Sequence, residues 1–219
     1  MAKMYPTKPF LFILYGYPGA GKTYFSRQFS EEVQVAHLQS DRIRAELFEQ
    51  PRYDKQENAV VNQLMNYMTE EFLSAGLSVI YDVNAARTGQ RHMLSDLAMR
   101  YRAQPLVIWF QLDVDTAFER TIHRDRRRSD DKYAAEWDRT TFEAFIERMQ
   151  KPSRQEEYVV VSGKHQFLAQ QSAVMSRLRR LGVINPDDAS SKVVKPGMIN
   201  LIPNTSGRVD LSRRNIYIR

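Results

Sequence analysis

Residues 10–23 read FLFILYGYPGAGKT, an apolar run that leads into a glycine-rich turn and ends in lysine and threonine. The continuous apolar run Phe10–Tyr15 is typical of a strand that is buried on both faces of a parallel sheet. The turn Gly16–Thr23 fits the pattern G-x-x-x-x-G-K-[ST] in full, and we expect a helix to begin at Lys22. A strand, this turn and a helix in that order form a phosphate-binding loop. The stretch therefore predicts an α/β domain that binds a nucleoside triphosphate.

The residues of this loop have separate predicted roles. Its three glycines let backbone N–H groups approach the phosphates closely. Lys22 is expected to reach the β and γ phosphates of ATP, and the Thr23 hydroxyl to bind Mg²⁺. The predicted nucleotide-binding residues are Gly16, Tyr17, Pro18, Gly19, Ala20, Gly21, Lys22 and Thr23. The alternative is a glycine-rich turn that binds nothing, but a chance match has a probability of roughly one per cent at average residue frequencies.

Apolar runs alternate with helical periods along the chain on either side of this loop. The expected strands are residues 10–15, 35–38, 77–81, 106–112 and 158–161. Three of the expected helices start at Lys22, Asp115 and Thr140. The other four cover residues 42–49, 56–74, 88–101 and 165–181. In the helix 56–74 we expect Val60, Leu64, Met68 and Phe72 to face the core. The alternation indicates parallel βαβ units, so we predict an α/β fold of three layers with a five-stranded parallel sheet.

The composition changes near residue 182, and the charge changes with it. Residues 31–100 carry a net charge of −4, residues 101–160 carry −1, and residues 161–219 carry +7. We therefore predict a domain over residues 1–182, with a helical lid around residues 124–140, and a basic C-terminal extension over residues 183–219. A short strand is expected at Asn215–Arg219.

The chain contains no cysteine, which excludes disulfides, thiolate metal sites and cysteine nucleophiles. The apolar run after Pro9 has six residues before Gly16, too few for a signal peptide, and no run reaches the length of a membrane span. We expect a cytoplasmic protein without a membrane partner. The four histidines show no spacing typical of a metal site.

A second group of polar residues follows the expected second strand, which ends next to Ser40 and Asp41. Asp41 should lie at the carboxyl edge of the sheet, where open α/β folds bind ligands, and Arg44 should share its helical face. There a carboxylate can accept the proton of an attacking hydroxyl while the arginine holds an anionic part of the acceptor. The alternative is that Ser40 or Asp41 only caps the helix that follows.

Over roughly residues 10–162 the chain resembles the P-loop kinases with an AAA-type ATP-binding core, a group that includes polynucleotide 5′-kinases and zeta toxins. The resemblance rests on GYPGAGKT, Asp41-x-x-Arg44, Asp82-x-Asn84 with Arg91 downstream, and Arg120-x-x-x-Arg124. In the polynucleotide kinase branch it implies that Asp41 is the general base and that Arg44 contacts an acceptor phosphate. It implies that Arg120 and Arg124 belong to a lid over the ATP phosphates. Both arginines are expected on one helix, four residues apart.

The remaining residues of the expected acceptor site are Asp82, Asn84 and Arg91, beside Asp41 and Arg44. Asp82 is also a candidate to hold Mg²⁺ through a bound water, with a loop-capping role as the alternative. Lys22, Asp41, Arg44, Arg120 and Arg124 are the expected catalytic residues.

These features predict an ATP-dependent phosphotransferase that acts on a hydroxyl group. The favoured acceptor is the 5′-hydroxyl end of single-stranded RNA or DNA, as in nucleic acid repair. The alternatives are a small-molecule kinase for a UDP-sugar, nucleoside or antibiotic, and a P-loop ATPase without an acceptor. The extension contains Arg208, Arg213, Arg214, Tyr217 and Arg219, which can track a single strand and stack on a base. The extension can equally pack on the core or pair with another copy of the chain.

Overall fold

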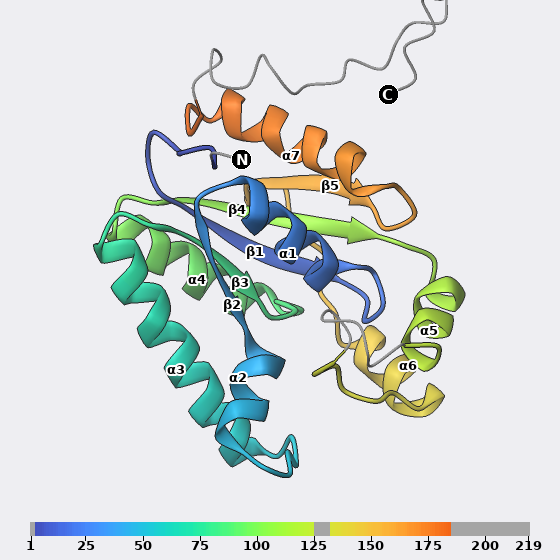
Figure 1. Cartoon of the computed structure of the whole chain (residues 1–219). Coiled ribbons are helices and arrows are strands. Elements are labelled where there is room, and N and C mark those ends of the chain that lie inside the picture. Colours follow the sequence, from blue (N-terminus) through green and yellow to red (C-terminus); the bar gives the residue numbers. More distant parts are fainter. Residues whose placement is uncertain (1–2, 125–131, 185–219) are drawn as a thin grey trace, which may run out of the picture. The chain divides into compact units, whose positions relative to one another are not determined.

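Strand β1 (Phe10–Gly16) lies at the centre of a parallel sheet in the computed structural model, which describes residues 3–124 and 132–184 (Figure 1). The other strands are β2 (Val35–Gln39), β3 (Ser78–Asp82), β4 (Gln104–Gln111) and β5 (Tyr158–Ser162). Their order across the sheet is β2-β3-β1-β4-β5, and every pair is parallel. All seven residues of β1 are buried, as its unbroken apolar run predicted.

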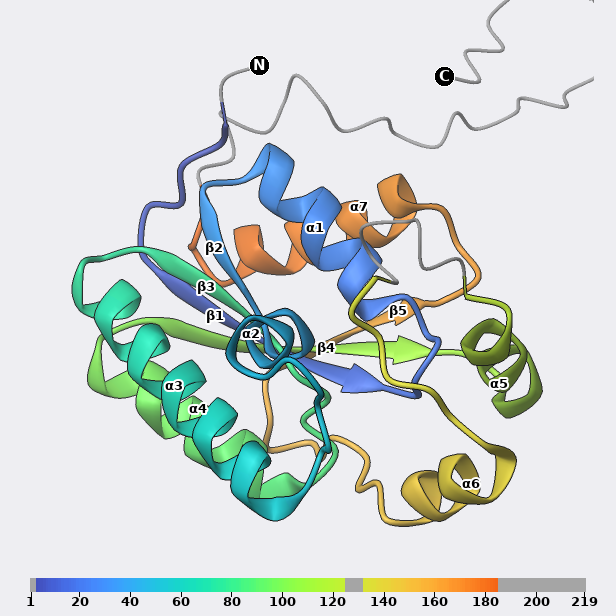
Figure 2. The ribbon, with the colours of Figure 1, turned by 60° about the horizontal axis from the view of Figure 1, so that its bottom comes forward.

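Helices cover both faces of this sheet, as Figures 1 and 2 show from two directions. The helices are α1 (Lys22–Glu32), α2 (Ser40–Leu47), α3 (Lys55–Ser74), α4 (Thr88–Arg100), α5 (Val114–Ile122), α6 (Arg139–Glu147) and α7 (Phe167–Arg180). Helices α1 and α7 lie on one face and α3 and α4 on the other. Successive side chains of β1 point to opposite faces, so Phe12 and Leu14 join the core under α1 while Leu11 and Ile13 join the core under α3. The predicted three-layer α/β fold is confirmed.

The fully buried face of α3 is shifted by one residue from the prediction, although Met68 and Phe72 do pack against the core as expected. Val61, Met65 and Leu73 are buried, whereas Val60 is 49% exposed. Apolar residues stand at neighbouring positions in three of the turns, 60/61, 64/65 and 72/73, so two helical faces share the same period and the pattern alone does not separate them. Asp54 sets the start of the helix, because its carboxylate accepts hydrogen bonds from the N–H groups of Gln56 and Glu57.

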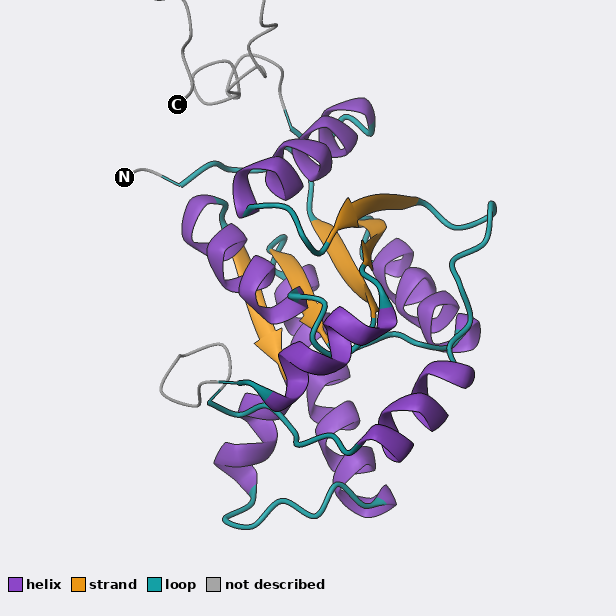
Figure 3. Cartoon of the chain, turned by 90° about the vertical axis from the view of Figure 1, so that its right-hand side faces the viewer, coloured by secondary structure: helices purple, strands orange, loops and turns teal. Residues whose placement is uncertain are grey.

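The carboxyl ends of all five strands meet at one edge of the sheet, because the strands are parallel. Figure 3 shows the strands side by side with the loops that leave this edge. The phosphate-binding loop follows β1 there, α2 begins directly after β2, and Asp82 is the last residue of β3. Segments that are distant in the sequence are therefore collected at one edge.

Two predicted features lie partly or wholly outside the described residues. Of the predicted lid, residues 125–131 are not described, and the predicted strand Asn215–Arg219 lies in the C-terminal segment 185–219, which is not described either. Val183 and Ile184 are buried in the core, so the packed chain continues two residues past the predicted boundary. No helix in residues 3–124 and 132–184 is long and apolar enough to cross a membrane.

Candidate functional site

The phosphate-binding loop is enclosed on its outer side by the backbone of α5. Gly19 has a φ of 83°, and a Cβ atom built on it would lie 2.2 Å from the carbonyl oxygen of Ala117. Gly21 has a φ of 90°, but a Cβ atom on it would meet open space. Glycine is therefore required at 19 by conformation, as predicted, and also by close packing against α5, which was not predicted. Only the fold reveals this, because Gly19 and Ala117 are 98 positions apart in the sequence.

Lys22 lies inside the curve of the loop. Its ammonium donates hydrogen bonds to the carbonyl oxygens of Gly16, at 2.9 Å, and Tyr17, at 2.8 Å. Burial lowers the pKa of Lys22 to about 8, although the nearby Asp82 carboxylate acts in the opposite direction. Lys22 therefore keeps its charge at neutral pH, close to where the loop's N–H groups gather at the start of α1.

A cavity of about 1110 Å³ opens at the carboxyl edge of the sheet in front of this loop. The predicted site residues that line it are Pro18, Gly19, Gly21, Lys22, Thr23, Asp41, Arg44, Asp82, Asn84, Arg120 and Arg124. Gly16 and Tyr17 contribute through their carbonyl groups to Lys22, and Ala20 is fully buried behind the loop. Most of the predicted residues are thus brought together.

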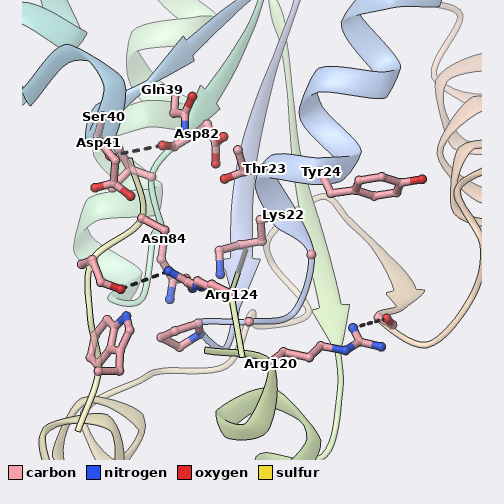
Figure 4. A pocket seen from close by; sticks show the side chains of 18 of the residues that line it. Lys22, Thr23, Tyr24, Gln39, Ser40, Asp41, Asp82, Asn84, Arg120 and Arg124 are labelled. Atoms are coloured by element: carbon pink, nitrogen blue, oxygen red, sulfur yellow. Dashed lines mark hydrogen bonds between the residues drawn. The ribbon is translucent and has the colours of Figure 1, made fainter. Parts of the chain in front are cut away.

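The cavity has two ends, with Lys22 and Thr23 between them (Figure 4). At one end, here called the α2 end, the lining residues include Asp41, Arg44, Tyr53 and Asn58. At the other, the β5 end, they include Tyr24, Arg120 and residues 163–168, which form the loop after β5 and the start of α7. A cavity with a phosphate-binding loop at its middle can hold two ligands that meet at one phosphate.

Asp41 lies in the first turn of α2 at the α2 end. Burial and, after it, the negative charge of Asp82 raise the pKa of Asp41 to about 6, against the opposing effect of the cations Arg44, Arg124 and Lys22. The N-cap of α2 is Gln39, and no side chain caps the helix among the described residues. The alternative reading of Asp41 as a helix cap is therefore not supported, and its carboxyl group faces the cavity (Figure 4).

Arg44 is nearly buried beside this carboxyl group, and most of its guanidinium is already bound. Its Nη1 donates to Glu57 at 3.2 Å and its Nη2 donates to the side chain of Asn58 at 2.6 Å. The guanidinium also lies over the Tyr53 ring, 4.5 Å from its centre. Only its Nε atom is buried without a hydrogen-bond partner within the described part of the chain. Arg44 thus anchors the segment that carries Tyr53, and its contact with an acceptor stays a prediction.

Asp82 and Asn84 hold the end of β3 against the loop and against β2. Nε2 of His37 lies 2.8 Å from Oδ2 of Asp82, and Oδ1 of Asn84 accepts a hydrogen bond from the N–H of Gly16. The amide nitrogen of Asn84 is buried and has no partner among the described residues, which leaves a donor at the cavity wall. His37 was missed by sequence reasoning, because it stands 45 positions from Asp82.

The Thr23 hydroxyl and the Asp82 carboxylate both line the cavity that Lys22 lines. Hydroxyl and carboxylate oxygens are hard ligands of the kind that Mg²⁺ takes, and this ion keeps several waters when it binds near phosphates. The donor set therefore fits the predicted magnesium site, with Thr23 as a direct ligand and Asp82 as a holder of bound water.

The predicted substrate contact of Arg91 is wrong. Its side chain is 0% exposed and does not line the cavity. The guanidinium donates to both carboxylate oxygens of Glu156, at 2.5 and 3.1 Å, and to the carbonyl oxygens of Ala85 and Gln150. Arg91 therefore ties α4 to the segment before β5, and its donors are used inside the fold.

Arg120 and Arg124 both line the cavity, but not as a pair on one helix. Helix α5 ends at Ile122, so Arg124 lies beyond it. Nη1 of Arg120 donates to the carbonyl oxygen of Gly163 at 2.8 Å, which directs Arg120 to the β5 end. Nη1 of Arg124 donates to the carbonyl oxygen of Ala135 at 3.0 Å, and its charge acts on both Lys22 and Asp41.

Comparisons with known proteins agree with this architecture. A family model described as "AAA domain" matches residues 11–152, more than half of the chain. The structure of Chaetomium thermophilum Kti12 in complex with ADP-AlF3 is similar with a TM-score of 0.59 at 16% identity, over 80% of this chain and 99% of that chain. The structure of a gluconokinase from Sinorhizobium meliloti is similar with a TM-score of 0.56 at 15% identity, over 80% of this chain and 94% of that chain.

A chain of the Pnkp1/Rnl/Hen1 RNA repair complex is similar with a TM-score of 0.54 at 20% identity, over 64% of this chain and 44% of that chain. No curated protein sequence matches the chain. At these identities each likeness shows a shared fold.

Proposed function

The chain belongs to the AAA domain family that its residues 11–152 match and has the fold of the P-loop kinases, and we propose that it is an ATP-dependent kinase that phosphorylates a hydroxyl group. Its nucleotide lies across the phosphate-binding loop, with the nucleoside toward the β5 end. The structure of Kti12 with ADP-AlF3 supports nucleotide binding by this fold. The acceptor then enters at the α2 end.

One observation carries the proposal. The Asp41 carboxyl group lines the same cavity as Lys22, and its charge interacts with both Lys22 and Arg124. A buried carboxylate beside a phosphate-binding lysine supports a reaction in which a second substrate gives up a proton. An ATPase needs only a positioned water, whereas this cavity continues past Lys22 into the α2 end with its own polar wall.

The residues of this site divide the work of phosphoryl transfer. Lys22 and the loop N–H groups hold the phosphates of ATP, and Arg124 adds positive charge where charge spreads over the equatorial oxygens. Ionised Asp41 accepts the proton of the acceptor hydroxyl and orients its oxygen. When it is bound, magnesium held by Thr23 and Asp82 would neutralise part of the negative charge of the phosphates.

We favour the 5′-hydroxyl end of RNA or DNA as the acceptor. The Asp41-x-x-Arg44 element and the likeness to a chain of an RNA repair complex support it. The likeness to a gluconokinase keeps a small polyol as the second candidate, since the two structures share the fold over 94% of that enzyme.

Radiolabelled ATP offered with a panel of acceptors tests this proposal. The panel contains 5′-hydroxyl RNA, 5′-hydroxyl DNA, nucleosides, UDP-sugars and gluconate. We expect label in the oligonucleotides, and Lys22→Ala should abolish it. Binding through about three phosphates should weaken roughly a hundredfold per tenfold rise in salt, whereas a neutral acceptor should lose far less. Label in small molecules alone would refute the nucleic acid acceptor, and no label above a no-acceptor control would refute the kinase.

A further inference from the structure

The cavity is bordered by an indole that the catalytic scheme does not use. Trp137 stands just before α6 and lines the cavity together with Phe145. Its ring packs edge-on against Phe142, which is fully buried, and against Phe145, with ring centres 6.1 and 5.2 Å apart. The two phenylalanines fix the indole from the side of α6, and the ring itself is half-buried.

Trp137 is placed toward the acceptor by its connection to Arg124. The hydrogen bond from Arg124 to the Ala135 carbonyl holds the segment that carries Trp137. Arg124 in turn interacts with Asp41 and Lys22. Arg120, which is bound to Gly163, belongs to the opposite end. The indole therefore borders the acceptor's part of the cavity and not the nucleoside of ATP.

The chemistry of this end favours a ligand with a flat apolar face and an anionic part. Tyr53 and Trp137 supply two aromatic rings from different segments, and Arg124 supplies a cation. Arg44 is paired with Glu57 and lies over the Tyr53 ring. A polyol acid such as gluconate presents a carboxylate to an arginine but has no flat π-face for an aromatic ring. A nucleotide presents a nucleobase to a ring and a phosphate to an arginine.

On the basis of the proposed function, we infer that Trp137 stacks on the terminal nucleobase of the acceptor strand and thereby selects a nucleotide end over a polyol. Trp137 is a specificity residue in this reading, because it contacts the base and not the reacting hydroxyl. Base–aromatic stacking of this kind corresponds to about a 5- to 150-fold change in affinity per base.

Kinetics with matched acceptors test the inference. The acceptors are a short 5′-hydroxyl RNA and the same RNA with an abasic 5′-terminal residue. Trp137→Ala should raise the KM for the complete RNA by about 5- to 150-fold while the KM for ATP stays unchanged, and Trp137→Phe should recover part of the loss. The abasic RNA should be a poor acceptor for the wild type and equally poor for Trp137→Ala. An unchanged KM for the complete RNA in Trp137→Ala would overturn the inference.

A binding measurement gives a second readout that does not depend on turnover. The chain has two tryptophans, and Trp109 lies on β4 against Tyr15 and Tyr158, away from the cavity lining. In Trp109→Phe the remaining fluorescence reports on Trp137. The complete RNA should quench it without ATP, and the abasic RNA and gluconate should not. Equal quenching by the abasic RNA overturns the base contact.

The outcomes separate the two claims. If the wild type labels RNA or DNA but Trp137→Ala behaves like the wild type, only the stacking inference fails. If the wild type labels no nucleic acid, the proposed acceptor fails and the inference with it. An unchanged thermal midpoint and an unchanged KM for ATP in Trp137→Ala exclude misfolding as the cause of a loss.

Discussion

Arg91→Met removes a guanidinium that is 0% exposed and leaves its partners in place. Glu156 then keeps one hydrogen bond, from the N–H of Ser153 at 2.7 Å, while its buried charge loses its counterion. The carbonyl oxygens of Ala85 and Gln150 also lose their donor. Breaking one side of a buried ion pair costs about 3–5 kcal/mol, so we expect a loss of that size in the free energy of unfolding.

Urea denaturation followed by circular dichroism at pH 7 measures this loss. With a slope of about 2–3 kcal/mol per molar urea, the midpoint should fall by about 1–2 M. Arg100→Met is the matched control on the same helix, because Arg100 is 66% exposed and pairs with Glu70 at 3.6 Å. An exposed pair contributes about 0–1 kcal/mol, so the control should stay near the wild type.

The double variant Arg91→Met, Glu156→Gln sharpens the test, because no charge is then buried alone. It should lose less than the sum of the two single variants. Although burial acts in the opposite direction, hydrogen bonds from Arg91 and Ser153 hold the pKa of Glu156 below its ordinary value. The stability from this ionised carboxylate is therefore present above its unfolded pKa and is lost as the pH falls. A midpoint unchanged by Arg91→Met, together with a raised acceptor KM, would refute the structural role and restore the substrate contact.

Asp41 and Gly19 give further predictions. Because the pKa of Asp41 is raised to about 6, kcat/KM for the acceptor should fall as the pH drops through that value, since a protonated carboxyl cannot accept a proton. A rate that is flat from pH 8 to pH 5 would contradict this. The same raised pKa means that ionised Asp41 costs folding stability, so Asp41→Asn should unfold at higher urea than the wild type at pH 8, and a lower midpoint would count against the burial argument. Gly19→Ala should abolish nucleotide binding in a calorimetric titration, because its Cβ atom would lie 2.2 Å from the carbonyl oxygen of Ala117. In Gly21→Ala the new Cβ atom meets open space, so this variant should retain weakened binding. Equal binding by both variants would disprove the packing role of Gly19.

The sequence predicted what short stretches determine. The phosphate-binding loop is encoded by eight consecutive residues, and the strand before it by six, so both were placed correctly. The buried face of α3 was not, because Val60 and Val61 are both apolar and only packing on the sheet chooses between them. Local pattern therefore predicted the elements better than their orientation.

In the candidate site, too, residues with a local sequence signal were placed correctly and residues that depend on distant contacts were not. Asp41 and Asn84 were placed at the cavity because each follows a strand at the carboxyl edge. Arg91 was misassigned because its partner Glu156 stands 65 positions away, and no periodicity links them. His37 and Trp137 carried no local signal either, since each is placed by contacts with side chains on other elements or segments.

The rate of phosphate transfer by Asp41→Asn tests the central claim most directly. Asparagine keeps the size of the side chain but does not accept the hydroxyl proton, and Lys22 and Thr23 remain in place to bind ATP. With radiolabelled ATP and a 5′-hydroxyl oligonucleotide, we expect the rate to fall on the order of 10²- to 10⁴-fold while the Kd for ATP stays that of the wild type. Wild-type transfer by Asp41→Asn would contradict the proposed general base.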